Sequence, residues 1–189
     1  MKVSREQAAK NRAHVVEVAG EQFREHGFDG IGIADLMKAA GLTHGGFYKQ
    51  FDSKDDLIAK ATRAALDQTA QRMSSLIGND TSEALEKAVS FYLSDQHRDG
   101  VSKGCAFAAL GSDVARHGPE VRRVMQRGVE EQLALLQPIV ETKGEASDRE
   151  VAIATMATMI GALVLARAVE SKALSTEILD AAAKAVLAK

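Results

Sequence analysis

Apolar side chains recur every three or four residues along the first quarter of the chain, which is the repeat of a helix with one buried face. Residues from about Ser4 to His26 predict one such helix. Gly27 is expected to end it, because glycine accepts the left-handed conformation found after a helix. A second, shorter helix is predicted from Gly32 to Ala40. The expected inner positions are Ala9, Ala13, Val16, Ala19 and Phe23 in the first helix, and Ile33, Leu36, Met37 and Ala40 in the second.

Residues that cap helices place the next two elements. Thr43 is expected to accept a backbone N–H at the start of a third helix that reaches about Gln50. Ser53 is expected to cap a long fourth helix that reaches about Ile77, with Asp56 at its third position as a variant capping box.

The rest of the chain also has a helical pattern. Asp80 or Thr81 can cap a helix that reaches about Arg98, and further helices are predicted over about 105–117, from Pro119 onward, over 148–170 and over 174–187. Pro138 is expected to kink the helix that begins at Pro119. No segment alternates apolar and polar residues as a strand does. The sequence therefore predicts an all-α fold of about nine helices.

Composition narrows the class of protein. The 189 residues are 46% hydrophobic and 26% charged with a net charge of −2, which is typical of a globular chain and excludes a basic surface over the whole molecule. Its single cysteine, Cys105, excludes a disulfide within the chain. The longest uncharged apolar run, residues 151–166, is shorter than the roughly 20 residues of a membrane span. We therefore expect a cytoplasmic protein without membrane contact.

The sequence contains no motif that indicates an enzyme. The five histidines form no closely spaced ligand pair, and neither a Gly-x-Ser-x-Gly elbow nor a P-loop is present. We expect no catalytic residue, no metal and no cofactor.

Two short helices joined at Gly41 fit a helix-turn-helix, in which the second helix enters the DNA major groove, although any three-helix packing unit has the same spacing. The residues at 27–36 and 39–54 closely resemble the TetR family of one-component transcriptional regulators. The resemblance implies a dimeric all-helical repressor that leaves its palindromic operator when a small molecule or a chemical modification reaches the C-terminal domain. It also implies a DNA-binding domain over 1–55 and a regulatory and dimerisation domain over 56–189. Whether the output is repression or activation stays open.

The same resemblance assigns roles around the recognition helix. Phe47 and Phe51 anchor the helix in the core, and Tyr48 and Lys54 contact phosphate, which sets register without reading sequence. Lys49 lies one turn beyond the groove-facing start of the helix, which consists of Thr43, His44, Gly45 and Gly46. Residues 1–60 hold nine basic and nine acidic side chains, so DNA contact needs a basic face of this segment. A helical ligand-binding or scaffolding module without DNA affinity is the alternative.

The second half contains the candidates for sensing an inducer. Phe91, Tyr92, Phe107, Met125 and Met159 are candidates for a ligand pocket, because methionine lines adaptable pockets, although such residues also form ordinary core.

Cys105 follows Gly104 at the start of a predicted helix, beside Lys103, and both features lower the pKa of a thiol. The residues at 104–114 are similar to the electrophile- and oxidant-sensing branch of the family, whereas a lone cysteine can also be a small buried hydrophobe.

The last two predicted helices are candidates for a dimer interface. The segment over 151–166 is apolar on nearly every side, so it must be buried on more than one face. The candidate contact residues are Ala154, Ala157, Gly161, Leu174 and Ile178. The resemblance implies that these helices of two subunits form a four-helix bundle.

Overall fold

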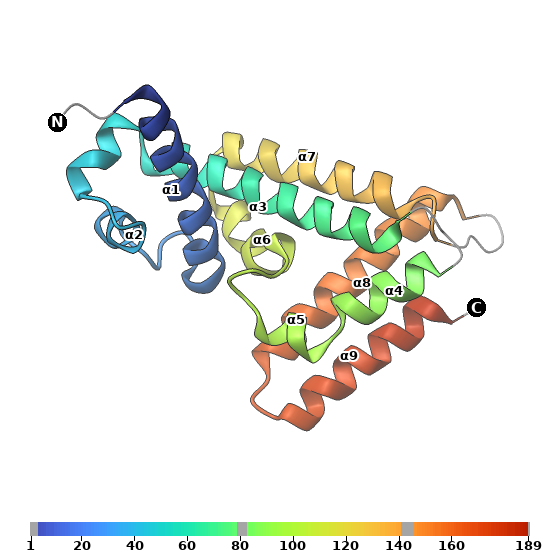
Figure 1. Cartoon of the computed structure of the whole chain (residues 1–189). Helices are drawn as coiled ribbons and strands as arrows, with labels where there is room; N and C mark the ends of the chain where they lie inside the picture. Colours follow the sequence, from blue (N-terminus) through green and yellow to red (C-terminus); the bar gives the residue numbers. More distant parts are fainter. Residues whose placement is uncertain (1–3, 79–82, 141–145, 189) are drawn as a thin grey trace.

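The computed structural model describes residues 4–78, 83–140 and 146–188, and every regular element in these ranges is helical. The predicted all-α class is confirmed. In order, the elements are α1 (Arg5–His26), α2 (Ile33–Ala39), the 3-10 helix η1 (His44–Lys49), α3 (Lys54–Ile77), α4 (Ala84–Tyr92), α5 (Asp95–Asp99), α6 (Ala106–Arg116), α7 (Pro119–Leu136), α8 (Asp148–Ala168) and α9 (Lys172–Leu187). Figure 1 shows α1, α2 and η1 as a small unit at one end, with the long α3 running into the larger helical body.

The N-terminal unit closes around one face of α1. Ser4 caps this helix by accepting the backbone N–H of Gln7 at 3.1 Å, and Gly27 ends it with a φ of 74°. The predicted inner face is only half correct, because Ala9 and Ala13 are exposed while Val15, Ala19 and Phe23 are buried. Ala9 and Ala13 lie on the surface of α1, where no described neighbour covers them.

The segment after Gly41 is a 3-10 helix, and Thr43 makes no side-chain capping bond, so that expected cap is wrong. Two consecutive glycines, Gly45 and Gly46, explain the weak helix, since each costs about 1 kcal/mol in helix propensity relative to alanine. The buried ring of Phe47 holds the segment in place instead.

The capping box at the start of α3 is shifted by one residue. Ser53 Oγ accepts the Asp56 backbone N–H at 3.0 Å, as expected. The Asp56 carboxylate accepts the N–H of Asp52 at 3.3 Å. The Asp56 side chain therefore binds the backbone N–H of the residue before the cap, Asp52, and not that of the cap residue Ser53.

The single helix expected up to Arg98 is instead two helices, α4 and α5, while Asp80 and Thr81 lie outside the described residues. Ser94 causes the break: its hydroxyl donates to Phe91 O at 2.8 Å and accepts from His97 N at 3.1 Å, which starts a new helix. The expected kink at Pro138 is also wrong, because α7 ends at Leu136.

The last two helices form an antiparallel pair at the far side of the body (Figure 1). Ser147 and Glu150 form a complete capping box at the start of α8, and Ser171 caps α9. Among the described residues, α8 is the one helix long and apolar enough to cross a membrane, with a mean hydropathy of 1.8. Its inner residues, among them Met159 and Leu163, belong to the common core with α9.

Candidate nucleic-acid interface and regulatory site

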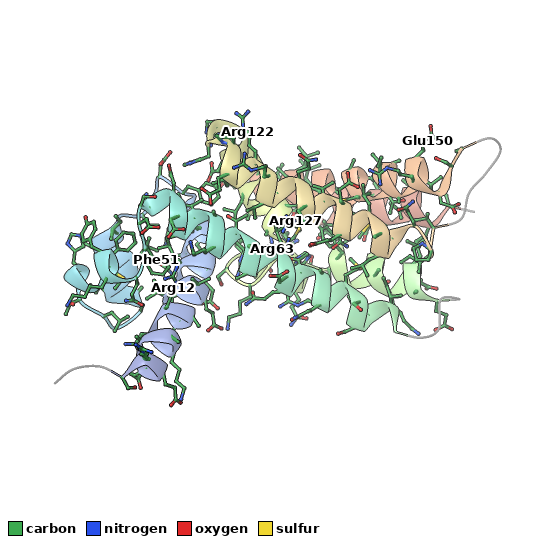
Figure 2. All side chains as sticks on the ribbon, turned by 90° about the horizontal axis from the view of Figure 1, so that it is seen from above. Arg12, Phe51, Arg63, Arg122, Arg127 and Glu150 are labelled. Carbon is green, nitrogen blue, oxygen red and sulfur yellow. The ribbon has the colours of Figure 1, made fainter. Side chains whose placement is uncertain are left out.

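The recognition segment η1 is anchored by aromatic side chains. Phe47 is fully buried and its ring centroid lies 5.4 Å from that of Phe51, which is also buried. The Arg12 guanidinium of α1 lies over the Phe51 ring at 5.1 Å, as the labelled side chains in Figure 2 show. This packing fixes the outer face of η1 relative to α1.

That outer face is open to solvent. Tyr48 is 66% exposed, its ring lies 5.8 Å from the ring of His44, and Thr43 is exposed as well. A Cβ on Gly45 would contact nothing within 4 Å, and one on Gly46 would meet Met37 at an ordinary 3.5 Å. Packing therefore requires neither glycine, and both leave bare backbone at the surface that would face a groove.

Two cations flank this surface. Lys49 is exposed and Lys54 is partly exposed at the first turn of α3, and neither forms an ion pair with a described residue. Arg5 at the start of α1 is also exposed, while Lys10 is paired with Glu6 at 2.7 Å. Tyr48 and Lys49 are thus exposed on η1, and Lys54 is partly exposed at the start of the next helix; all three side-chain types can bind phosphate oxygens.

A second candidate site surrounds Cys105, the residue that caps α6. The thiol is 3% exposed, and its backbone N–H donates to His97 Nε2 at 3.1 Å. Burial raises the pKa of Cys105 above its ordinary value, and the neighbouring Tyr92 phenol and Arg167 only partly offset this effect. The expected lowering of the thiol pKa is therefore wrong. Lys103 does not lower the pKa of the thiol, because its side chain is 75% exposed and its ammonium lies 3.8 Å from the Glu21 carboxylate.

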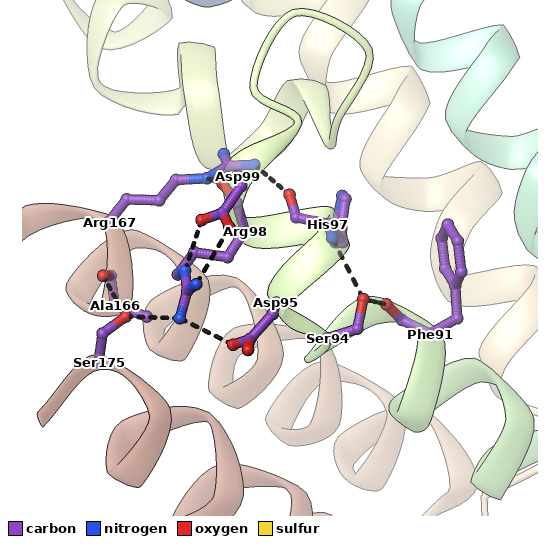
Figure 3. Close-up of polar contacts among 9 residues, drawn as sticks. All are labelled: Phe91, Ser94, Asp95, His97, Arg98, Asp99, Ala166, Arg167 and Ser175. Atoms are coloured by element: carbon purple, nitrogen blue, oxygen red, sulfur yellow. Dashed lines mark hydrogen bonds and ion pairs between the residues drawn. The ribbon is translucent and has the colours of Figure 1, made fainter. Parts of the chain in front are cut away.

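His97 is held in one tautomer by its two neighbours. Its Nδ1 lies 2.7 Å from the Tyr92 carbonyl oxygen, which can only accept, so Nδ1 carries the proton and Nε2 is free to accept from Cys105 N. Burial lowers the pKa of His97, and the charges of Arg167 and Arg72 lower it further. Figure 3 shows the Arg167 guanidinium reaching the His97 carbonyl beside the ion pairs of Arg98.

Four of the five predicted pocket residues come together. Tyr92 lines two small cavities beside Cys105, Phe91 lines one of them, and Phe107 and Met159 line the other. Met125 lines neither and packs, half-buried, against the core.

The predicted dimer residues lie on the outer side of the α8–α9 pair. Ala154 and Ala157 are exposed, Gly161 is half-buried, and a Cβ on Gly161 would meet nothing within 4 Å. Large apolar side chains that are also exposed continue this surface, namely Ile153, Val164, Leu165 and Leu174, and Ile178 is half-buried beside them. The single chain leaves this apolar face uncovered.

Three contacts join the Cys105 loop and α6 to the N-terminal unit, and none of them was predicted from the sequence. Arg24 of α1 is buried and donates from Nε to Ser102 O, in the loop that leads to Cys105. At the other end of α6, Asp113 accepts the Phe28 N–H at 3.1 Å, and the Phe28 ring packs edge-on against His117 at 4.9 Å. The one available signal was a charged Arg24 beside Phe23 on the apolar face of a predicted helix.

The arrangement defines a class of protein: a helix-turn-helix with an exposed recognition segment, joined by a long helix to a helical body with a small internal site. Comparison with known proteins agrees. Residues 15–61 match the family described as bacterial regulatory proteins, tetR family. The transcriptional repressor NemR of Escherichia coli K12 is 24% identical over 137 residues, which cover 71% of this chain and 69% of NemR. The regulator AcrR of Shigella flexneri is 32% identical over 57 residues, or 30% of this chain and 26% of AcrR.

Solved structures share the whole fold. Reduced E. coli NemR superposes with a TM-score of 0.78 at 21% identity, covering 95% of this chain and 96% of NemR. A TetR regulator from Chloroflexus aurantiacus superposes with a TM-score of 0.75 at 25% identity, covering 95% of both chains. Residues 15–61 thus carry the tetR-family match and the whole chain is similar to TetR-family regulators, and the protein is a DNA-binding transcriptional regulator.

Proposed function

We propose that this regulator is a cytoplasmic repressor that binds a palindromic operator as a homodimer and releases it when a small molecule enters the cavity beside Cys105. The observation that supports DNA binding is the exposed face of η1. Tyr48 and Lys49 are exposed on this face, whereas Phe47 is buried in the core. Names of relatives support repression, since NemR and the KstR2 protein of Rhodococcus jostii are both called repressors.

Within this proposal the DNA-contact residues divide into two groups. Tyr48, Lys49 and Lys54 hold phosphate oxygens and set the register of the protein on the duplex. Thr43 and His44 approach base edges, and the bare backbone at Gly45 and Gly46 allows close approach to the groove.

The exposed apolar face of α8 and α9 supports a two-fold dimer. Leu165 is 57% exposed and Leu174 is 44% exposed, which costs free energy unless a partner covers them. A second copy presenting the same face would bury both, and small residues such as Ala157 and Gly161 would let the helices approach closely. We infer a DNA-binding domain over 1–55 and a regulatory and dimerisation domain over 56–189.

The contacts of α6 support a route from cavity to DNA. Cys105 caps its first turn at the cavity, and Asp113 near its last turn holds the N–H of Phe28 in the N-terminal unit. Arg24 makes a second link, to the loop that ends at Cys105. A ligand that displaces the start of α6 would therefore shift the position of the recognition segment, and a bias of a few kcal/mol between two packings empties an operator.

A thiol-reactive inducer is a second candidate, because Cys105 lines both cavities. The raised pKa predicts slow reaction of the resting protein. Operator release after treatment with N-ethylmaleimide should be lost in Cys105→Ser. If Cys105→Ser responds as the parent does, the thiol is ordinary core.

The proposal is tested by gel shift with the promoter region next to the gene, comparing the parent protein with Lys54→Ala and with Lys184→Ala as a matched control on α9. Lys54→Ala should weaken binding to all sequences alike. It should also reduce the slope of log affinity against log salt by about 1.8 for a dimer, because each lost phosphate contact accounts for about 0.9. No binding by the parent would favour the scaffolding alternative, and an unchanged salt slope in Lys54→Ala would remove Lys54 from the interface.

A further inference from the structure

The Cys105 site has a charged end and an apolar end. Two cavities, each with about 20 Å³ of room for the centre of a water molecule, share Tyr92, Cys105, Thr69 and Met73 in their walls. The first also touches Arg72, while the second runs between the helices of the body. They flank the Tyr92–Cys105 pair, so a molecule that displaced these side chains slightly would occupy both.

Arg72 lines the first cavity, and two further arginines, Arg24 and Arg167, bind backbone carbonyls of the same segment, residues 97–103, without an ion-pair partner among the described residues. Arg24 donates to Ser102 O, Arg72 to Lys103 O at 2.7 Å, and Arg167 to His97 O at 2.8 Å, so three separate helices direct arginines at the segment before Cys105. None of the three forms an ion pair with a described residue. The nearest acids are engaged elsewhere, since Asp99 is paired with Arg98 and Glu21 lies beside Lys103.

These charges act on the site itself. Arg167 lowers the pKa of both His97 and Cys105, and Arg72 also lowers that of His97, so both arginines generate a positive potential there. No aspartate or glutamate lines either cavity. Arg24 is buried, Arg167 is half-buried and Arg72 is exposed, and the nearby acids Glu21 and Asp99 attract Arg24 and Arg167 without forming ion pairs with them. An anion in the first cavity would be attracted most directly by Arg72, which lines it.

Two buried hydrogen-bond donors near this end lack a strong acceptor. Arg167 Nη1 finds no hydrogen-bond partner among the described residues, and the Tyr92 hydroxyl has only the Cys105 thiol, a weak acceptor, beside it. Both can donate, and a carboxylate is an acceptor with two oxygens. His97 cannot serve as a further acceptor for a ligand, because its Nε2 already accepts from Cys105 N.

The other end accepts an apolar body. Its walls include Met73, Met156 and Met159, whose flexible thioethers adapt to irregular shapes. Gln132, with an unpartnered and buried amide oxygen, is the one polar side chain there besides those shared with the first cavity. Each cavity as it stands has room for about one water molecule, so a larger ligand requires rotation of the methionines to enlarge the site.

We propose that the inducer of this regulator is a compact carboxylate, held with its anionic head toward Arg72 and the two buried donors and with its apolar body among the three methionines. This inference rests on the proposed function and specifies the ligand class of the same site. The carboxylate neutralises the charge of Arg72 and displaces the start of α6.

The test is calorimetric titration of the full chain with benzoate, phenylacetate and hexanoate, and with benzamide as the uncharged isostere of benzoate. At least one carboxylate should bind with a dissociation constant below about 1 mM, and benzoate should bind about tenfold more tightly than benzamide. Arg72→Gln should remove that tenfold preference, Arg72→Lys should restore part of it, and Lys103→Gln, a neighbouring exposed cation that lines neither cavity, should keep it. A merely structural role of Arg72 would weaken benzoate and benzamide equally.

The carboxylate that binds should also release the promoter fragment in a gel shift at the same concentration. The proposal is overturned if no carboxylate binds at about 10 mM, if benzamide equals benzoate in the parent protein, if Arg72→Gln leaves the preference unchanged, or if binding does not release DNA. Operator binding by the ligand-free protein is measured separately in the same gel. Its loss would refute the proposed function, whereas its presence with failure of the carboxylates would refute this inference alone.

Discussion

Gly128 of α7 lies inside a helix at a position where one added methyl group would meet a buried side chain of a neighbouring helix. A Cβ built there lies 2.7 Å from Leu66 Cδ1, 3.0 Å from Cδ2 and 3.2 Å from Cγ. Leu66 belongs to α3 and is 2% exposed, so its side chain has no free space in which to retreat. Gly128→Ala must therefore force the Leu66 side chain into another rotamer or move α7 away from α3, the two long helices that run together through the body (Figure 1).

Two opposing effects set the magnitude. Replacing a glycine inside a helix by alanine stabilises by about 1 kcal/mol through backbone entropy. Overpacking a full core costs about 1–3 kcal/mol. We expect a net loss of about 1 kcal/mol in the free energy of unfolding, which lowers the melting temperature by about 2–4 °C for a chain of this size.

Gly111 of α6 is the matched control, because it is also inside a helix but a Cβ there meets nothing within 4 Å. Gly111→Ala should raise the free energy of unfolding by about 0.5–1 kcal/mol. Urea unfolding of both variants at one protein concentration gives the comparison, and the fixed concentration removes any contribution of dimerisation. In the double variant Leu66→Ala/Gly128→Ala, the two changes should compensate by at least about 0.5 kcal/mol. Equal stabilisation by Gly128→Ala and Gly111→Ala would refute the packing argument.

Three further outcomes are expected. Because burial lowers the pKa of His97 below its ordinary 6.5, the unfolded chain binds a proton before the folded chain does as the pH falls. The free energy of unfolding should therefore decrease below about pH 6.5, and it should decrease less in His97→Gln. Equal pH dependence of the urea midpoints of the two proteins would contradict this. Gly161→Glu places a charge on the exposed apolar face of α8 and should give monomers with poor operator affinity in sedimentation and gel shift; a stable dimer that binds DNA would locate the interface elsewhere. Thr43→Ala should change which operator variants are preferred, whereas Tyr48→Phe should weaken binding to all of them. Selection from a randomised operator library distinguishes these two results.

Much of this molecule could be predicted from local patterns. Periodicity, the cap at Ser53 and the stop at Gly27 placed most helices within a few residues, because these signals depend on contacts inside one turn. The recognition segment was visible for the same reason, as a continuous run from Thr43 to Lys54. The local signals failed at Ser94, where a side chain that caps a new helix interrupted an otherwise continuous pattern.

The sequence by itself determined the fold class, the exposed recognition surface and the small-residue stripe on α8. Only the tertiary structure decided the character of the Cys105 site. The helix start and the neighbouring Lys103 predicted a thiol of lowered pKa, but burial beside Tyr92 raises the pKa of Cys105 more than these two features lower it. Burial depends on segments that are distant in the sequence, so local patterns do not reveal it. Arg24, Arg72 and Arg167 lie 48 and 95 positions apart along the chain, from 24 to 72 and from 72 to 167, and no periodicity could bring them to one short segment, residues 97–103. Side chains that far apart in sequence meet only because helix packing places their carbonyl partners within 3 Å or so of each guanidinium.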